Sequence, residues 1–593
     1  MENLELLEPE RLYKSQLKDQ HHERVEKYLD DLVKKSQINK EENRATCDSL
    51  YHVQAEIKQL NTRLGRSNFL RVLCIIMIII GAFFGVLGGI VIASGNGLAG
   101  GLMIGGGVLA LVGGILLLAL VYKKKARALN NMLDMKNKEA DQLKKRAQEQ
   151  MMPLWVLIDE QVPAKLFHET APLIEMDRLF DIQKYEFLKE QYGYQDINKE
   201  NRSILGLQSG SILGNPFIFY KELEMNMVPH RYEGTLVITY TTTIRTSQGT
   251  RTVTRTQTLH AYVTKPRPEY STDTYLMYAN EAAPRLSFSR NHSNINSYDE
   301  KGLEKYVRKH EKDLTDLANK QMKKGGTYTP LGNPEFELFF GGLDRDNEVE
   351  YRLLFTPLAQ KSMLSLMKSN VGYGDDFTFK KRKMLNFITS VHSQGNALFC
   401  DPKMFYEIDY EVLKDKFISY NDNYFKSIFF DLAPLLSIPL YQQHKAHSYI
   451  YKGTVPTNFT RQEHEAIANR FDPKSFAHPD SKTQAILKTT AVKNGIHDSV
   501  CVTAHTFDAI DRVDLVPVMG GDGRMHSVPV HWYEYIPLTQ DTNVNVDDIG
   551  GDRVKFNSLG NNNMIFNRGL VSYNQDEPLN IPIEELKAKM AKK

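Results

Sequence analysis

The stretch that most constrains the fold runs from residue 69 to 122, because it holds no charged side chain after Arg71. An α-helix needs about 20 consecutive apolar residues to cross the hydrocarbon core of a bilayer. Two such runs are present, 72–93 and 98–122, and the turn-forming residues 94–97 separate them. The sequence therefore predicts a transmembrane helical hairpin with two spans over 69–122.

The charges that flank this stretch predict its orientation, because basic residues next to a span favour the cytoplasmic side. Basic side chains lie before the first run and after the second, at Arg63, Arg66, Arg71, Lys123, Lys124, Lys125 and Arg127. We therefore expect a multi-pass protein of the cell membrane with both termini in the cytoplasm. The lipid bilayer is then one expected partner.

Small residues repeat every four positions in both runs, and this spacing lets helix backbones approach closely. The positions expected to form this helix packing are Gly81, Gly85, Gly89, Gly97, Gly101 and Gly105. Packing of the two spans against each other needs only one such stripe per helix. Self-association of copies through the second stripe therefore stays an open expectation.

Apolar residues in the N-terminal arm alternate in steps of three and four, which is the pattern of a coiled-coil seam. The seam consists of Leu50, Val53, Ile57, Leu60 and Leu64. A weaker apolar stripe follows the hairpin at 129–151, so we expect the two arms to pair as an antiparallel coiled-coil stalk. The alternative is an arm that lies along the C-terminal body.

Composition excludes few functions. The formal net charge of +2 and the lack of a basic surface with interleaved aromatic residues argue against a nucleic-acid partner. The four cysteines are Cys47, Cys74, Cys400 and Cys501. They lie too far apart to suggest a disulfide framework or a zinc knuckle, which favours a reducing compartment.

The C-terminal body shows the pattern of an α+β fold with antiparallel hairpins. Alternating residues from Gly234 predict a β-hairpin over 234–264, with its turn at Gln248-Gly249 and with Ile244 opposite Val253. A charged helix is expected at 301–324. Strands are expected at 336–340, 348–355, 376–379 and 384–388, and a core helix within 406–440.

The predicted fold class is thus a membrane-anchored α+β protein, in which a coiled-coil and transmembrane helical hairpin precedes a large cytoplasmic body. The expected segments are a helical coiled-coil arm (1–68), the two-span hairpin (69–122), a second helical arm (123–152), an α+β domain (153–330), an α+β core (331–450), a β-rich region (451–540) and a loosely ordered tail (541–593).

One segment of the body resembles a known family. Asn333-Pro334-Glu335-Phe336-Glu337, the run Glu348-Val349-Glu350-Tyr351-Arg352 and Leu354-Phe355-Thr356-Pro357 are similar to the domain of unknown function 3137, a family of uncharacterised bacterial membrane proteins. The resemblance covers about residues 333–405. It implies a membrane protein of unknown role and brings no catalytic residues. Thr356 and Pro357 also suit the cap and first position of a helix.

Three groups of residues could carry chemistry. Cys501 lies near His497, Asp498 and His505, as a nucleophile and its base might, but such partners usually come from separate segments. Histidines that could hold a metal are His444, His447, His464, His478, His526 and His531, although no HExxH motif is present. Turn residues 520–523 lack the rest of a phosphate-binding loop, and 344–348 lack the rest of a calcium loop.

The sequence therefore predicts no catalytic, cofactor or metal residues and no cofactor. The leading hypothesis is a non-catalytic scaffold that is anchored in the membrane, faces the cytoplasm, forms oligomers and binds an unidentified protein partner. One alternative is a membrane-tethered hydrolase that uses Cys501 or a histidine-bound metal. Another is an accessory subunit of a transport or membrane-maintenance complex.

Overall fold

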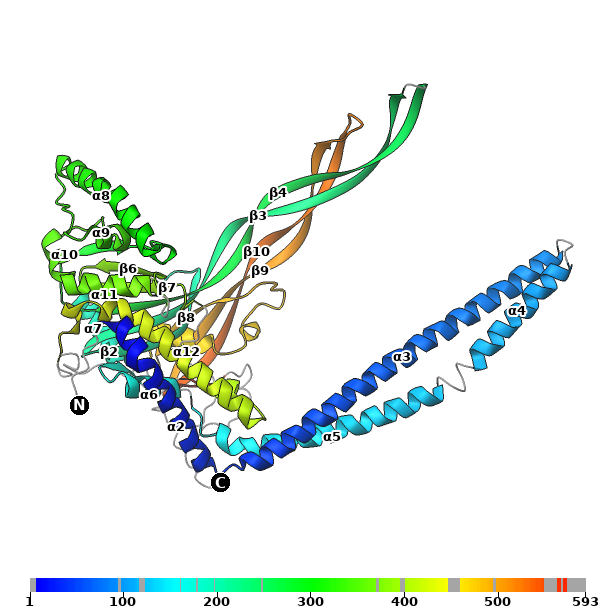
Figure 1. The fold of residues 1–593 in the computed structure, drawn as a ribbon, viewed down its shortest axis with the longest axis horizontal. Coiled ribbons are helices and arrows are strands. Elements are labelled where there is room, and N and C mark those ends of the chain that lie inside the picture. Colours follow the sequence, from blue (N-terminus) through cyan, green and yellow to red (C-terminus); the bar gives the residue numbers. More distant parts are fainter. Residues whose placement is uncertain are drawn as a thin grey trace. The chain divides into compact units, whose positions relative to one another are not determined.

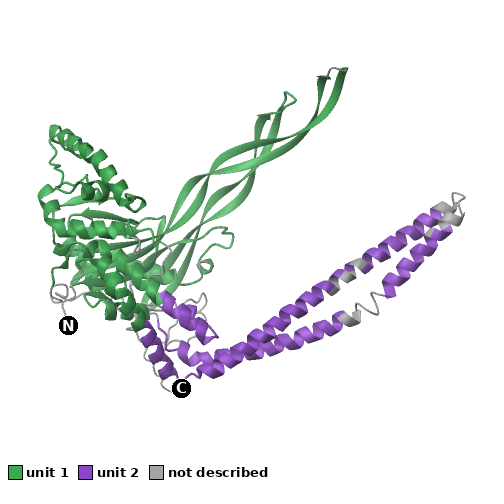
Figure 2. Cartoon of the chain, in the orientation of Figure 1, with its two compact units in different colours: residues 1–24, 161–399, 421–593 green, residues 25–160, 400–420 purple. Residues whose placement is uncertain are grey.

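The computed structural model describes residues 7–93, 97–116, 123–159, 161–177, 180–196, 198–246, 249–369, 373–394, 400, 402–445, 459–493, 497–548, 563–566 and 569–572. The chain divides into two compact units (Figure 2). Unit 1 holds residues 1–24, 161–399 and 421–593, and unit 2 holds residues 25–160 and 400–420. Each unit is described below by itself.

Unit 2 consists mainly of three helices, α3 (Lys40–Ala93), α4 (Gly97–Leu116) and α5 (Lys123–Trp155). Helices α3 and α5 lie side by side (Figure 1), and of the predicted seam Leu50 and Val53 are buried. Ile57, Leu60 and Leu64 are half-buried. Ion pairs join the two helices at Lys136–Glu56 and Arg146–Glu42, each with an N–O distance of 2.8 Å.

Glycines bring α3 and α4 into contact. A Cβ added at Gly81 would lie 2.7 Å from the carbonyl oxygen of Gly107, and one added at Gly107 would lie 2.9 Å from the backbone nitrogen of Gly85. A Cβ added at Gly89, Gly101 or Gly105 would meet open space. Gly97 is the first residue of α4. A Cβ added at Gly85 also meets open space, although its backbone lies beside Gly107. Of the predicted packing glycines, Gly81 therefore faces the neighbouring helix directly.

The predicted transmembrane hairpin is wrong. Among the helices of the described residues, none combines the length and the apolar character that crossing a membrane requires. The apolar run 72–93 is the end of a 54-residue helix whose first half is charged, and eight of the 20 residues of α4 are glycine, which has no side chain to bury. Two further predictions rested on this hairpin and are therefore wrong as well. They are the membrane-anchored fold class and the two-span location in the cell membrane with both termini in the cytoplasm.

Two antiparallel sheets build unit 1 (Figure 1). The seven-stranded sheet has the order β1 (Ile174–Met176), β2 (Arg202–Ile212), β3 (Asn215–Thr246), β4 (Gly249–Ala279), β7 (Leu385–Ser390), β6 (Phe377–Arg382) and β5 (Ser287–Arg290). The five-stranded sheet has the order β11 (Asn563–Phe566), β12 (Gly569–Ser572), β10 (Met525–Asp548), β9 (His497–Met519) and β8 (Ile486–Lys493). Strand β8 is therefore an edge strand.

The remaining helices are short, apart from α2, α8 and α12. Their bounds are α1 (Pro9–Leu12), the π-helix η1 (Tyr13–Leu17), α2 (Lys18–Ser36), α6 (Val162–Thr170), α7 (Ile182–Tyr192), α8 (Glu300–Lys323), α9 (Pro334–Phe340), α10 (Glu348–Leu354), α11 (Pro357–Lys368), α12 (Tyr410–Leu436) and α14 (Arg461–Ala468), with 3₁₀ turns η3 (Ile295–Ser297), η4 (Pro402–Phe405), η5 (Pro439–Gln442) and η6 (Pro473–Ser475). Helix α8 agrees with the helix expected at 301–324.

The strands expected at 336–340 and 348–355 are helices α9 and α10. The Asn333 side chain accepts a hydrogen bond from the backbone N–H of Phe336, and Asn347 caps α10 in the same way. Phe336, Phe339 and Phe340 are buried together. The buried residues of α9 recur at the helical spacings of three and four. The alternation of apolar residues that predicted a strand was misleading. The Thr356 cap of α11 agrees with the sequence.

The hairpin of β3 and β4 is longer than predicted, and its register differs by two residues. Leu236 lies opposite Leu259, and Ile244 lies opposite Arg251 rather than Val253. A shift of two residues keeps every side chain on its face of the ribbon, so alternation alone cannot distinguish the two registers.

A second long hairpin, β9–β10, packs face to face on the first (Figure 1). Their shared cluster contains Ile238, Leu259, Ala261, Val528 and Val530. Gly234 makes close approach possible, because a Cβ there would meet the carbonyl oxygen of Pro529 and lie 2.9 Å from the Val530 Cα. The hairpins are therefore held together by an apolar seam that admits no side chain at position 234.

We expect Gly234→Ala to destabilise unit 1 by about 1–3 kcal/mol, the usual effect of overpacking. The added methyl group meets backbone atoms, which cannot move aside as a side chain can. Urea unfolding would measure the change. Thr235→Ala, at an exposed neighbouring position, is the control and should unfold almost as the unchanged protein does. Equal stability of the two variants would contradict the close packing.

The start of α2 is anchored inside unit 1 by His21. Its Nε2–H donates to the backbone oxygen of Asn421 (3.2 Å), and the Thr170 hydroxyl lies 2.9 Å from Nδ1. The ring stacks on Phe425 at a centroid distance of 4.2 Å. Burial lowers the pKa of His21 to about 4, and the nearby charge of Arg24 acts in the same direction. The imidazole is therefore neutral at pH 7.

Acidification should weaken this anchor. The unfolded chain takes up the His21 proton near its ordinary pKa of about 6.5, but the folded chain does so only near 4. The stabilising contribution is complete above pH 6.5 and falls by about 3 kcal/mol as the pH drops to 4. Urea unfolding of His21→Gln should show a smaller pH dependence than that of the unchanged protein, and parallel curves would contradict the assignment.

Candidate functional site

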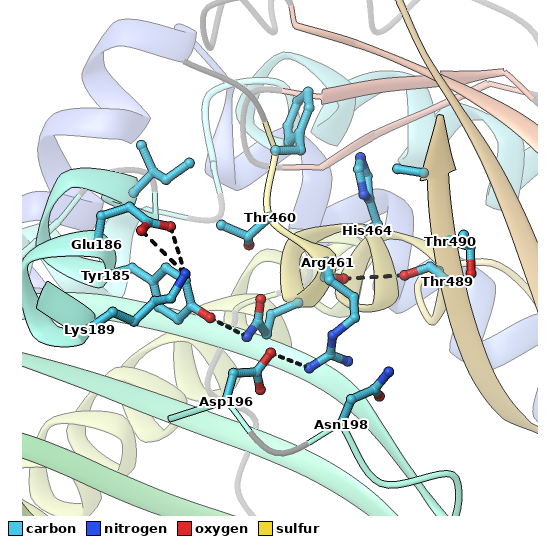
Figure 3. A pocket seen from close by; sticks show the side chains of 14 residues that line it. Tyr185, Glu186, Lys189, Asp196, Asn198, Thr460, Arg461, His464, Thr489 and Thr490 are labelled. Carbon is cyan, nitrogen blue, oxygen red and sulfur yellow. Dashed lines mark hydrogen bonds and ion pairs between the residues drawn. The ribbon is translucent and has the colours of Figure 1, made fainter. Parts of the chain in front are cut away.

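A polar groove opens in unit 1 where helix α7, the start of α14 and strand β8 meet (Figure 3). Its volume is about 540 Å³, within the size range of ligand sites. One core positions all three elements, because side chains of α7 and α14 pack together with those of both sheets. Its fully buried members include Leu188, Ile218, Ala466, Leu487 and Val502.

Helix α7 forms one wall of the groove. Asp181 caps the helix by accepting hydrogen bonds from the backbone N–H groups of Gln183 and Lys184, and Gly193 ends it in the left-handed conformation. Four lining residues, Ile182, Tyr185, Glu186 and Lys189, share one face at the spacing i, i+3, i+4, i+7. Lys189 Nζ lies 3.2 Å from the carboxylate of Glu186.

The first turn of α14 forms the end of the groove. Thr460 and Glu463 form a reciprocal capping box, so the helix terminus already has its partners. Arg461 pairs with Asp196 at 2.7 Å and with the buried Glu465 at 2.5 Å. Burial lowers the pKa of Arg461, but these two carboxylates outweigh burial and hold the pKa above its usual value. Arg461 is therefore a fixed cation at the groove.

Strand β8 forms the opposite wall and contributes Thr489, Thr490 and Ala491. The Ser203 hydroxyl donates to the Leu487 carbonyl oxygen at 2.7 Å. This places the backbone groups of Leu487 on the outer edge of β8. Backbone groups of alternate residues point to the same edge of a strand, so we expect the N–H and C=O groups of Thr489 and Ala491 to point toward the groove. In the sheet as described, β9 is the only neighbour of β8.

This arrangement suits binding rather than catalysis. The groove presents two cations, Lys189 and Arg461, and two carboxylates, Glu186 and Asp196, beside a strand edge that has no strand partner in the part of the chain that the structure describes. The Tyr185 hydroxyl accepts a hydrogen bond from Gln462 Nε2 at 2.6 Å, and burial raises its pKa, so it stays neutral. The described residues that line the groove include no cysteine or serine.

Cys501, the nucleophile of the alternative hydrolase hypothesis, does not pair with His505. Cys501 lies within β9, opposite Thr490 of β8 and Asn543 of β10. His505 lies four residues further along the same strand, opposite Thr539. Two residues four apart on a strand are separated by about 13 Å, too far for proton transfer. A hydrolase that uses Cys501 with a neighbouring residue of β9 therefore has no support in this geometry.

The histidines considered as metal ligands lie apart from one another. His464 Nε2 lies 3.3 Å from Asp498 Oδ2, His526 is 3.0 Å from Asp522 and His531 is 3.5 Å from Asp511. His444 is exposed, and His478 lies beside Asp480. His447 lies outside the described residues. Among the residues that the structure describes, no group of three or more potential ligands could hold a metal ion.

The two loops considered for phosphate and calcium are structural. Residues 520–524 form the turn of the β9–β10 hairpin, with Gly523 at φ +75°. Asp344 and Asp346 accept hydrogen bonds from the backbone N–H groups of Ser289 and Ser287. These carboxylates therefore hold β5 in place.

Sequence reasoning missed a buried cluster at the end of β7. His392 Nδ1 lies 2.7 Å from Asp376 Oδ2, and Nε2 lies 3.3 Å from Asp431 Oδ1. The Ser393 hydroxyl donates to Asp431. Burial lowers the pKa of His392, but Asp376 and Asp431 outweigh burial and raise it. His392, Asp376 and Asp431 come from different segments of the chain, so no local sequence pattern predicted this cluster. The imidazole and Asp431 are each only 4% exposed and Asp376 is 21% exposed, so the cluster lies mostly in the interior.

The ion pairs of His392 should stabilise the fold most strongly at low pH. Since the folded pKa lies above the ordinary value, the contribution is complete below about pH 6.5 and is lost as the pH rises through the folded pKa. We expect His392→Gln to lower the free energy of unfolding at pH 6 by about 3–5 kcal/mol, the usual effect of breaking a buried pair. Urea unfolding should show a smaller difference at pH 9, and a constant difference would contradict the charge assignment.

The resemblance of residues 333–405 to the domain of unknown function 3137 remains a prediction. Comparison of the chain with protein-family models, with curated proteins and with solved structures finds no match.

Proposed function

We propose that this chain is a non-catalytic interaction protein that binds an extended segment of a partner polypeptide in the groove between α7 and β8. The observation that carries the proposal is the outer edge of β8, which has no strand partner among the described residues and lines a groove large enough for several residues. An extended peptide can add to such an edge as a further antiparallel or parallel strand.

The two walls of the groove serve different purposes in this proposal. Backbone groups of Thr489 and Ala491 supply hydrogen bonds that do not depend on the partner's sequence. The face of α7, with Ile182, Tyr185 and Lys189, supplies contacts that do depend on it. The apolar side chains favour a partner with alternating apolar residues, and the ion pairs favour charged residues between them.

Ion pairs at the groove can be exchanged for ion pairs with a partner. The side chains of Lys189 and Glu186 are 39% and 31% exposed, so a bound carboxylate could reach Lys189 without burying an unpaired charge. Arg461 is less exposed and also holds Glu465. Lys189 is therefore the better position for a test, because its side chain is more exposed and an exposed ion pair contributes little to stability.

The test begins with selection of twelve-residue peptides from a random displayed library on the full chain. The tightest peptide is then synthesised and titrated by calorimetry. We expect Lys189→Ala to weaken binding about tenfold, as loss of a contact worth about 1.4 kcal/mol would. Lys199→Ala removes the same charge from a nearby exposed position that does not line the groove, and should bind normally.

Strand addition is tested by chemistry on the peptide. N-methylation of every second amide should abolish binding in one of the two alternating patterns, because only one set of amides faces β8. Ala491→Pro removes one N–H at the groove edge and should weaken binding while the β8–β9 pairing is retained. Binding that tolerates both N-methylation patterns, or that is unaffected by Lys189→Ala, would contradict the proposal.

A further inference from the structure

The β3–β4 hairpin reaches beyond the hairpin that covers it. The turn of β9–β10 ends beside Gln257, whose side-chain oxygen accepts a hydrogen bond from the Gly521 backbone N–H at 2.8 Å. From this point on, the strands formed by residues 240–246 and 249–255 pair only with each other among the described residues, and we call them the distal ribbon. Tyr240, at its base, still packs against the covering hairpin. At about 3.3 Å per residue its seven pairs span about 23 Å. Figure 1 shows this tip extending past β9–β10.

The covered part of the ribbon shows what kind of surface it accepts. Its inner face carries apolar side chains such as Ile238 and Leu259 together with one cation, Lys265. On the covering hairpin, valines pack against these apolar side chains. The carboxylate of Asp514 lies 2.8 Å from Lys265 Nζ. An apolar strand pair bearing a carboxylate is therefore the complementary surface.

The two hairpins also differ in overall charge. Between residues 234 and 268 the chain has no acidic residue and five basic ones. Residues 497–548, which form β9, β10 and their turn, contain nine acidic and two basic residues. The packing of these hairpins thus joins a basic surface to an acidic one.

The distal ribbon repeats the pattern of the covered part, and beyond Tyr240 no packing against another described element is found. By strand alternation its inner face holds Ile244 and Val253, both partly exposed, and the two cations Arg251 and Arg255. Arg245 lies on the outer face. Among the described residues, no ion pair of these three arginines is found, and Arg251 and Arg255 are exposed.

We propose that the inner face of the distal ribbon is a second docking surface, which takes an acidic β-strand or β-hairpin of a partner protein with apolar residues at alternate positions. A second copy of this chain fits poorly, because its distal ribbon carries the same positive charges and its acidic hairpin already covers its own ribbon. The apolar positions Ile244 and Val253 favour a protein over a nucleic acid.

The experiment measures fluorescence anisotropy of a labelled peptide of four Glu-Val repeats with the full chain. We expect saturable binding that weakens with salt, and no binding of the matching Lys-Val peptide. Replacing Arg245, Arg251 and Arg255 by Gln should raise Kd about tenfold. The control replaces Lys305, Lys309 and Lys312 by Gln, three exposed cations of α8, and should leave Kd unchanged within about twofold.

A second variant removes most of the inner face of the distal ribbon, including Ile244, Arg251 and Val253, and keeps Arg255. Because Thr241 lies opposite Thr254, residues 242–253 can be replaced by Asn-Gly, a turn that closes a two-residue hairpin. This variant keeps the covered part of the ribbon and should lose the Glu-Val peptide but still bind the peptide selected for the α7–β8 groove. Equal binding by this variant would overturn the proposal. So would tighter, arginine-dependent binding of a 20-nucleotide duplex than of the Glu-Val peptide.

Discussion

A single buried carboxylate joins helix α14 to strands β2 and β8. Glu465 of α14 is fully buried and accepts a hydrogen bond from the Ile204 backbone N–H of β2 at 3.1 Å. It also pairs with Lys488 of β8 at 2.8 Å and with Arg461 at 2.5 Å. A carboxylate in the interior is tolerated only when its charge is paired and its oxygens are hydrogen-bonded. The contacts of Glu465 meet this condition and fix α14 against both sheets at once.

This constraint explains why the edge of β8 is open where it is. Near Leu487 and Lys488, β2 contributes Ser203 and the carbonyl oxygen of Arg202 to the edge. Further along, Arg461 turns toward Asp196 and Glu465, and the edge at Thr489 and Ala491 faces the groove instead. The ion pairs that fix α14 in the core therefore also set the position of Arg461 at the groove.

Local patterns predicted elements with strong local signals and failed where distant contacts decide. The charged helix α8 and the Thr356 cap of α11 follow from spacing and capping chemistry. Helices α9 and α10 were mistaken for strands because short apolar runs fit both periods. The groove itself could not be predicted, since Lys189, Arg461 and Thr489 come from segments up to 300 residues apart. The absence of charge in 72–122 was also a poor guide, because it does not distinguish glycine from large apolar residues.

The part of the β3–β4 ribbon that extends beyond β2 and β7 has two strand edges with no partner among the described residues, and another copy could add to such edges. Near the body, Pro229 lies opposite Pro266, and proline offers no N–H to an incoming strand. The distal ribbon has no proline, but its arginines repel a second ribbon of the same charge. The positive charge that discourages pairing between two distal ribbons also attracts an acidic strand. If the distal ribbon selects an acidic partner, the arginines that provide affinity therefore also keep the protein from aggregating through this arm.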